Sequence, residues 1–157
     1  MENGVKSPKV LVILGSSRED SNTLKAIRKF VPYKDYQIVD LRNLYIRQHD
    51  YDHSKLQGDD FLKIAYKMLD ADIIYFSTPV YWYSMSTLMK TFFDRLSELL
   101  STHKPIGKAL KGKQTYLIVS SGSNELPEGF EVPFRRTSEY FKMNFGGTYF
   151  QWDGELS

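Results

Sequence analysis

Three near-continuous apolar runs constrain the fold of this chain more than any other feature. They are KVLVIL at 9–14, DIIYF at 72–76 and TYLIV at 115–119. A strand with one face in solvent alternates polar and apolar residues, whereas a strand covered on both faces is apolar throughout. Such strands occur in parallel sheets, because the connecting helices cover both faces. The runs therefore predict an α/β fold with a central parallel sheet.

Two further segments, 36–41 and 148–152, alternate more, as edge strands do, and complete a five-stranded sheet. Apolar residues at helical spacing separate the strands, at 21–31, 59–69, 86–100 and 132–143. This order predicts a doubly wound parallel sheet in three layers, joined by right-handed crossovers. The sequence stops at Ser157, soon after the fifth strand, so we expect the final helix to be lacking. Residues 1–157 are predicted to form a single domain.

The composition excludes several classes of function. The chain has no cysteine, which excludes disulfides, thiol catalysis and metal centres held by thiolates. Its formal net charge is +2, with scattered basic residues, so we expect no nucleic-acid or membrane-surface partner. The N-terminus lacks the apolar core of a secretory signal, and no run approaches ~18 apolar residues. A cytoplasmic location follows as the expectation.

His49 and His53 have the spacing of metal ligands on a helix, with aspartates nearby. The surrounding segment QHDYDHSK does not have a helical pattern, so this spacing does not place the two imidazoles on a shared face. We interpret the segment as a solvated loop and expect no metal site.

The loop after the first predicted strand, 15–23, has the chemistry of an anion site. Ligands of such folds bind at the carboxyl ends of the strands, and this loop leads into a helix N-terminus with free backbone N–H groups. Donors come from Ser16, Arg18, Ser21, Asn22 and Thr23. They suit a phosphate monoester, although neither the dinucleotide fingerprint nor the triphosphate loop is present. Alternatively, Ser21 only caps the helix and Arg18 is solvated.

The loop after the third predicted strand, 77–86, carries three consecutive rings at 81–83. Rings at this place either cap the sheet or pack against a flat amphipathic ligand whose polar edge the backbone recognises. Ser84 or Ser86 is expected to cap the helix that follows.

The loop after the fourth predicted strand, 120–124, has the sequence SSGSN. Its glycine permits close approach of the backbone to a ligand. The same composition also occurs in ordinary loops, so this segment alone does not distinguish the two interpretations.

Three segments resemble the NADPH-dependent FMN reductase family, which comprises flavodoxin-like NAD(P)H oxidoreductases. They are GSSREDSNT, TPVYWYSMSTLMKTFFDRL and LKGK, and the similarity runs from about Val10 to Trp152. The resemblance implies a flavodoxin-like fold and bound FMN, with NAD(P)H as co-substrate. It also implies electron transfer to a small-molecule quinone, azo, nitro or flavin acceptor.

The resemblance also assigns cofactor-binding residues. The phosphate is held by Ser16, Arg18, Ser21, Asn22 and Thr23; the ring and ribityl chain lie against Pro79, Val80, Tyr81, Trp82, Tyr83 and Ser84; and the far side is closed by Ser121, Gly122 and Ser123. No catalytic side chain is expected, because the flavin performs the chemistry. Asp94 and Arg95 match the family pattern, but their place within a helix indicates a structural or interfacial role.

Two other classes of function fit the same residues. The chain can be a flavodoxin-like electron carrier for a protein partner, or a flavin-binding regulatory module without NAD(P)H activity. By analogy with the family, carriers use an acidic docking surface, whereas this chain is slightly basic.

We expect a homodimer. With no helix after the fifth strand, the first helix lacks its usual neighbour, and Phe150 and Trp152 on one side of that strand need cover. The resemblance supports this, since related reductases are typically dimers. Alternatively, the segment 43–57 folds over the gap and leaves a monomer.

Overall fold

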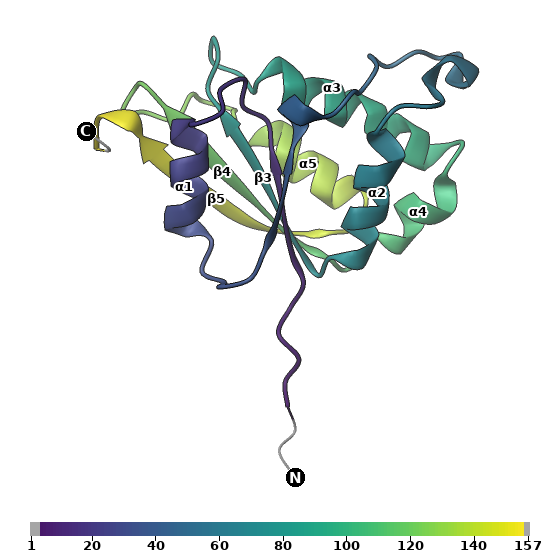
Figure 1. The fold of residues 1–157 in the computed structure, drawn as a ribbon, viewed down its shortest axis with the longest axis horizontal. Helices are drawn as coiled ribbons and strands as arrows, with labels where there is room; N and C mark the ends of the chain where they lie inside the picture. Colours follow the sequence, from purple (N-terminus) through teal and green to yellow (C-terminus); the bar gives the residue numbers. More distant parts are fainter. Residues whose placement is uncertain (1–3, 156–157) are drawn as a thin grey trace.

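The computed structural model describes residues 4–155 and contains one sheet of five parallel strands (Figure 1). The strands are β1 (Val10–Leu14), β2 (Gln37–Asp40), β3 (Ile73–Pro79), β4 (Gln114–Ser121) and β5 (Asn144–Trp152). Their spatial order is β2-β1-β3-β4-β5, the flavodoxin-like order of doubly wound sheets. The predicted five-stranded parallel sheet is confirmed.

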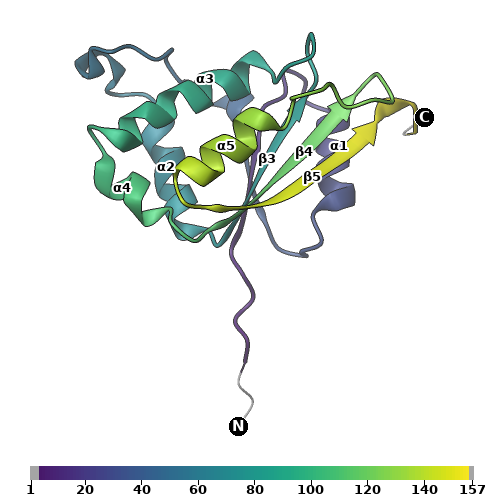
Figure 2. The ribbon, with the colours of Figure 1, turned by 180° about the vertical axis from the view of Figure 1, so that it is seen from behind.

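Five α-helices cover the sheet in the described part of the chain. They are α1 (Asn22–Phe30), α2 (Phe61–Asp70), α3 (Thr87–Arg95), α4 (Lys104–Ala109) and α5 (Val132–Tyr140). Helix α1 lies on one face of the sheet and the other four lie on the opposite face (Figures 1 and 2). The result is the predicted three-layer arrangement. None of the described helices is long and apolar enough to cross a lipid bilayer.

The burial of β1 shows why its sequence is apolar throughout. Leu11 and Ile13 belong to a large core cluster with the helices α2 to α5, whereas Val10, Val12 and Leu14 pack with α1 on the other face. All five residues of β1 are buried. A parallel strand between two helical layers therefore leaves no polar position.

The prediction of four helices was wrong, because the sequence pattern does not indicate α4. Its sequence KPIGKA contains Pro105 and Gly107, which are typical of turns. Pro105 stands in the first turn, where its missing N–H costs nothing. A Cβ at Gly107 would lie 2.1 Å from the backbone oxygen of Leu99, so close packing requires glycine there.

The helix predicted at 86–100 is also shorter than expected. It ends at Arg95 and continues as a 3₁₀ turn, Leu96–Leu100. Residues three apart are eclipsed in a 3₁₀ turn, which brings Glu98 onto Arg95.

Strand β5 begins four residues earlier than predicted, at Asn144 rather than Thr148. Gly146 and Gly147 lie within the strand, at a bulge where Gly147 has φ +129°. The preceding helix ends through Lys142, which takes the left-handed conformation at φ +58°.

The two faces of β5 bear on the expected homodimer, because that expectation rests on uncovered apolar residues along this strand. Phe150 packs against the core shared with α2 to α5 and is covered, whereas Trp152, two residues further along the strand, is 38 % exposed. On the face covered by α1, the one α-helix there among the described residues, Tyr149 contacts Phe30 at a centroid distance of 5.3 Å and Tyr116 at 6.0 Å, and these three rings are partly exposed. The bulge inserts one extra residue between Phe145 and Thr148, which places Phe145 and Phe150 against the same core.

The alternative cover for this gap, the segment 43–57, lies elsewhere. Leu44 and Ile46 pack against the core of α2 to α5, on the face away from α1. That segment connects β2 to α2 and extends beyond α3 (Figure 1). It does not cover Tyr116 and Tyr149.

A buried ion cluster fixes this long connection to α3. The Arg95 side chain is 1 % exposed, and it donates to Asp59 Oδ2 and Glu98 Oε2, each at 2.5 Å. Its guanidinium also donates to the backbone oxygens of Arg47 and Leu56, at 3.0 and 3.4 Å. The guanidinium is thus surrounded by acceptors from both ends of the connection.

The same cluster shifts the titration of Asp59. Burial acts to raise the pKa of its carboxyl, but hydrogen bonds from Arg95 and from the N–H groups of Arg47 and Phe61 outweigh it. The pKa of Asp59 therefore lies below its usual value.

We predict that Asp59→Asn lowers the free energy of unfolding by about 3 kcal/mol at neutral pH, since it leaves a buried guanidinium incompletely paired. Because the folded pKa of Asp59 is depressed, its stabilisation is complete above the unfolded value of about 3.9. The deficit of the variant should shrink as the pH falls through the lower, folded pKa. Denaturant unfolding at a series of pH values measures both effects.

Asp70→Asn is the matched control, because Asp70 pairs with Lys9 on the surface. Its loss should cost less than about 1 kcal/mol. Equal losses for the two variants would show that the Arg95 cluster does not stabilise the fold.

Candidate functional site

The loops after β1, β3 and β4 meet at the carboxyl edge of the sheet, where they enclose two adjoining hollows. One hollow has a volume of about 230 Å³ and is lined mainly by the first loop. The other has a volume of about 670 Å³ and lies between the second and third loops. Val80, Ser121 and Gly122 line both hollows, so an elongated ligand can occupy the two together.

The smaller hollow collects all five residues predicted to hold an anion. Its lining consists of Ser16, Arg18, Ser21, Asn22, Thr23, Pro79, Val80, Tyr81, Ser120, Ser121, Gly122 and Asp153. Arg18 is exposed at the rim, whereas Ser16 and Thr23 are buried.

The start of α1 supplies free donors to this hollow. Ser21 caps the helix by accepting the N–H of Leu24 at 3.1 Å, as one interpretation of the sequence required. The N–H groups of Asn22 and Thr23, in the first turn, have no acceptor within the helix. The Thr23 hydroxyl is held by Ser120 Oγ at 2.7 Å. Capping and anion binding are therefore compatible here, because they use different donors.

Close packing fixes the position of the first loop. A Cβ at Gly15 would lie 3.0 Å from both Met89 Cβ and Ser86 Oγ, so a larger residue would push the loop away from α3. Ser17 Oγ lies 3.0 Å from the Tyr81 hydroxyl and links the first loop to the second.

The three rings form an exposed tight turn rather than a cap on the sheet. Tyr81 and Ser84 pair as an isolated antiparallel bridge, with Trp82 and Tyr83 between them at φ +48° and +66°. Trp82 is 93 % exposed and Tyr83 is 76 % exposed. Strained backbone and exposed rings beside a hollow are typical of a ligand-binding segment.

The larger hollow contains most of the remaining predicted residues. Trp82, Tyr83 and Val80 line one side, and Ser121, Gly122 and Ser123 line the other. The N–H of Ser123 already donates to Ser121 Oγ at 3.1 Å, so Ser123 contributes less to a ligand than its position suggests.

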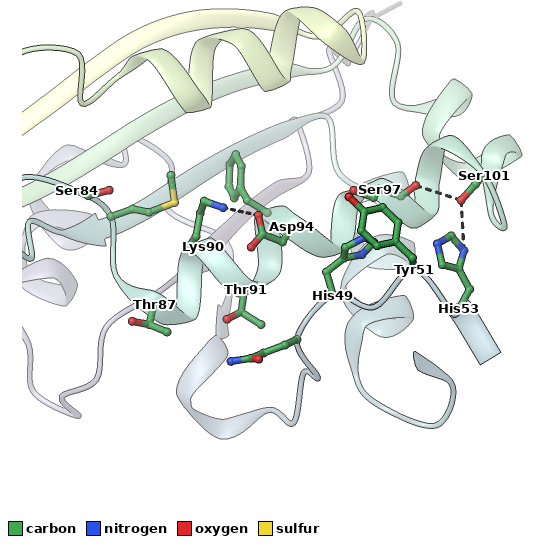
Figure 3. Close-up of a pocket in the computed structure, with 13 residues that line it drawn as sticks. His49, Tyr51, His53, Ser84, Thr87, Lys90, Thr91, Asp94, Ser97 and Ser101 are labelled. Atoms are coloured by element: carbon green, nitrogen blue, oxygen red, sulfur yellow. Dashed lines mark hydrogen bonds and ion pairs between the residues drawn. The ribbon is translucent and has the colours of Figure 1, made fainter. Parts of the chain in front are cut away.

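Ser84 is the predicted site residue that the structure places outside both hollows. It faces a third hollow of about 990 Å³ on the far side of the turn 81–84, along α3 (Figure 3). Asp94 also lines that groove, where it pairs with Lys90, whereas Arg95 is buried behind it.

Several lining residues were missed by the sequence analysis. Asp153, just after β5, lines the smaller hollow, and its Oδ1 atom is buried without a hydrogen-bond partner. Glu125, Leu126 and Glu128 line the larger one. Because these residues lie beyond the short motifs, only the folded chain brings them to the site.

The two hollows fit a phosphate ester joined to a flat ring. The smaller one offers N–H and hydroxyl donors and an arginine, and the larger one offers rings and an apolar wall. Asp153 accepts hydrogen bonds but repels anions, so it suits a hydroxylated linker between the two parts better than the phosphate.

Comparisons with known proteins agree with this chemistry. The sequence profile described as NADPH-dependent FMN reductase matches residues 8–130. YwqN of Bacillus subtilis strain 168, named as an NAD(P)H-dependent FMN-containing oxidoreductase, is 30% identical over 149 residues, covering 88% of this chain and 82% of YwqN. An FMN-dependent NADH:quinone oxidoreductase of Pelagibacter ubique is 33% identical over 92 residues, covering 54% of this chain and 46% of that protein.

A solved structure, the Trp repressor binding protein from Bacillus subtilis, has a TM-score of 0.72 and 27% identity. The match covers 90% of this chain and 85% of the other.

We predict that Tyr83→Gly leaves the melting temperature of the ligand-free protein unchanged or raises it. The left-handed backbone costs a non-glycine residue about 1 kcal/mol, and the exposed ring contributes no core packing. Tyr75→Ala, at a buried position of β3, is the control and should lower the melting temperature strongly. A large fall for Tyr83→Gly would mean that this ring stabilises the sheet after all. The melting temperatures of both variants are measured by thermal unfolding, with circular dichroism as the signal.

Proposed function

This chain belongs to the NADPH-dependent FMN reductase family, and from that premise we propose that it transfers electrons from NAD(P)H through FMN to a quinone-type acceptor. As a family member it is an oxidoreductase with FMN as cofactor and NAD(P)H as electron donor. The observation that carries the proposal is the pair of joined hollows at the carboxyl edge of the sheet. A cytoplasmic location is part of it.

In this proposal the first loop holds the cofactor phosphate. The N–H groups of Asn22 and Thr23 and the positive end of α1 face it, and Arg18 adds a charge from the rim. The Oδ1 atom of Asp153, which is buried without a hydrogen-bond partner, accepts from a ribityl hydroxyl.

The turn 81–84 and the loop 121–123 hold the isoalloxazine ring in the larger hollow. When bound, FMN accepts hydride from the nicotinamide and passes the electrons on to the acceptor. The residues of the chain bind and orient it: Trp82 and Tyr83 offer ring faces, and the Gly122 backbone approaches its polar edge. No side chain of this hollow needs to act as an acid or base.

A quinone is the acceptor best supported, because one relative is named as an NADH:quinone oxidoreductase. Azo compounds, nitroaromatics and free flavin remain acceptors of the same chemical kind. The competing function, an electron carrier or flavin-binding module, predicts slow reduction by the nucleotides.

The test is anaerobic stopped-flow reduction of the FMN-loaded protein, followed by oxidation with a panel of quinones. Rapid bleaching of the flavin by NADH or NADPH and its recovery with a quinone are expected. Binding of FMN with no fast reduction by either nucleotide would favour the carrier or module. Failure of the deflavinated protein to bind FMN would contradict both the reductase and the carrier or module.

We predict that Arg18→Ala weakens FMN binding without lowering stability. A charge-assisted hydrogen bond is worth roughly 1.5–3 kcal/mol, and the exposure of Arg18 favours the lower end, about tenfold in Kd. Arg28→Ala, near the opposite end of the same helix, should leave Kd unchanged. Fluorescence quenching of FMN measures both, and an unchanged Kd for Arg18→Ala would mean that the helix N-terminus alone holds the phosphate.

We also propose a homodimer formed through the sheet face beside α1. That face carries the partly exposed rings of Phe30, Tyr116 and Tyr149, and within residues 4–155 only the helix α1 lies over it. Light scattering coupled to size exclusion should give about twice the chain mass of 18.3 kDa. Tyr149→Arg should reduce it to the mass of one chain; a monomeric wild type would contradict the proposal.

A further inference from the structure

A groove of about 990 Å³ runs along the outer side of α3, separate from the two hollows described above. Figure 3 shows Ser84 at one end and His53 and Ser101 at the other, with Thr87, Lys90 and Thr91 on α3 between them. From Thr87 to Ser101 the helix and its 3₁₀ extension span roughly 20 Å, at about 1.5 Å per helical residue. The groove is therefore long as well as large.

One end of the groove adjoins the proposed flavin site. Trp82 and Tyr83 line the larger hollow, and the next two residues, Ser84 and Met85, line the groove. The tight turn 81–84 therefore borders both spaces. A ligand with one end over the flavin ring can reach into the groove past this turn.

The other end of the groove is built from three rings on the connection between β2 and α2. The rings of His49 and Tyr51 meet edge to face at a centroid distance of 5.1 Å, and His53 lies 6.1 Å from His49. His53 Nδ1 lies 2.5 Å from Thr102 Oγ1. Tyr51 is 93 % exposed, and the buried Nδ1 atom of His49 has no hydrogen-bond partner. These groups offer stacking faces and an unused polar atom.

The segment that carries these rings, residues 48–55, is fixed by the buried side chain of Arg95. The Arg95 guanidinium donates to the backbone oxygens of Arg47 and Leu56, which flank residues 48–55 on either side. A buried group thus fixes both ends of a loop whose rings are exposed. Loops that carry function on a fixed scaffold have this construction.

The middle of the groove suits a phosphate group held loosely. Thr87 and Thr91 supply hydroxyls, and Lys90 pairs with Asp94 across one helical turn. Both members of this pair are about half exposed, and such surface pairs contribute little. Lys90 can therefore turn toward a ligand at low cost.

Resting on the proposed function, we propose that this groove binds the adenosine diphosphate half of the nicotinamide nucleotide. The adenine stacks on Tyr51 and His49, the ribose meets the hydroxyls of Ser97 and Ser101, and the pyrophosphate lies near Lys90. The nicotinamide then passes the turn 81–84 to reach the flavin ring. One ligand accounts for the length of the groove, its rings at one end and its opening toward the flavin at the other.

The test measures donor binding and flavin reduction separately. Isothermal titration of the FMN-loaded protein with ADP-ribose should show binding that Tyr51→Ala and His49→Ala each weaken roughly tenfold, the loss of one stacked ring. In stopped flow, Tyr51→Ala should raise the NADPH and NADH concentrations for half-maximal reduction rate by the same factor. The limiting rate should not change, because the nicotinamide end is untouched.

Reduced nicotinamide mononucleotide, which lacks the adenosine half, is the discriminating donor. It should reduce wild type and Tyr51→Ala at the same rates. Tyr45→Ala is the matched control variant: Tyr45 is 62 % exposed on the same connection but outside the groove, and its loss should change nothing.

Each outcome separates the groove from the proposed function. If ADP-ribose binds and Tyr51→Ala weakens this binding, the proposed role of the groove is supported even where the flavin is not reduced. If ADP-ribose does not bind, or binds wild type and Tyr51→Ala equally, the groove is overturned even where reduction is fast. A change in association state alone, seen by light scattering for Tyr51→Ala, would identify the groove as a subunit contact and also overturn the proposal.

Discussion

Parallel pairing of β1, β3 and β4 is the constraint on which the site depends. Leu14 pairs with Ser77, and Pro79 pairs with Ser120, so the three strands end at one edge in register. The loops that follow Leu14, Pro79 and Ser121 are far apart in the sequence, but they therefore begin at neighbouring positions along one edge of the sheet. The apolar runs that dictate this pairing contain no functional residue, yet they bring the anion-binding loop, the ring-bearing turn and the glycine loop together.

The sequence predicts the parallel strands and the helix caps because the patterns that encode them are local and strong. Buried parallel strands are apolar throughout, and the caps of α1 and α3 come from Ser21 and Ser86, as short-range chemistry allows. The family resemblance named most of the residues that line the two hollows, and it also named Ser84, which lines neither. Asp153 and Glu125 needed the folded chain, since no local pattern indicates what a distant loop faces.

The failures also have physical causes. Gly107 resembles a loop residue, but it lies in a helix because α4 packs directly onto the backbone of Leu99. Gly146 resembles a helix stop, but a Cβ there would lie 2.2 Å from the ring of Tyr116, so glycine admits that ring over the strand. The bulge at Gly147 adds one residue before Thr148, so that Phe145 and Phe150 pack against the same core. In each case a glycine serves tertiary packing rather than a turn.

Arg95 connects the fold with the function at a distance from the cofactor. Its place within a helix predicts a structural or interfacial role, and its burial between Asp59 and Glu98 agrees with the structural one. By holding the connection from β2 to α2 against α3, it also shapes the wall of the groove. A residue without contact to a ligand can in this way determine where one binds.

The central claim is that three loops form one FMN site, and amide hydrogen exchange with and without FMN tests it most directly. The account predicts that FMN slows exchange in residues 15–23, 80–84 and 121–123 together, while residues 48–55 are unchanged. Protection confined to the first loop, or spread over residues 48–55 in place of the turn and the third loop, would contradict it.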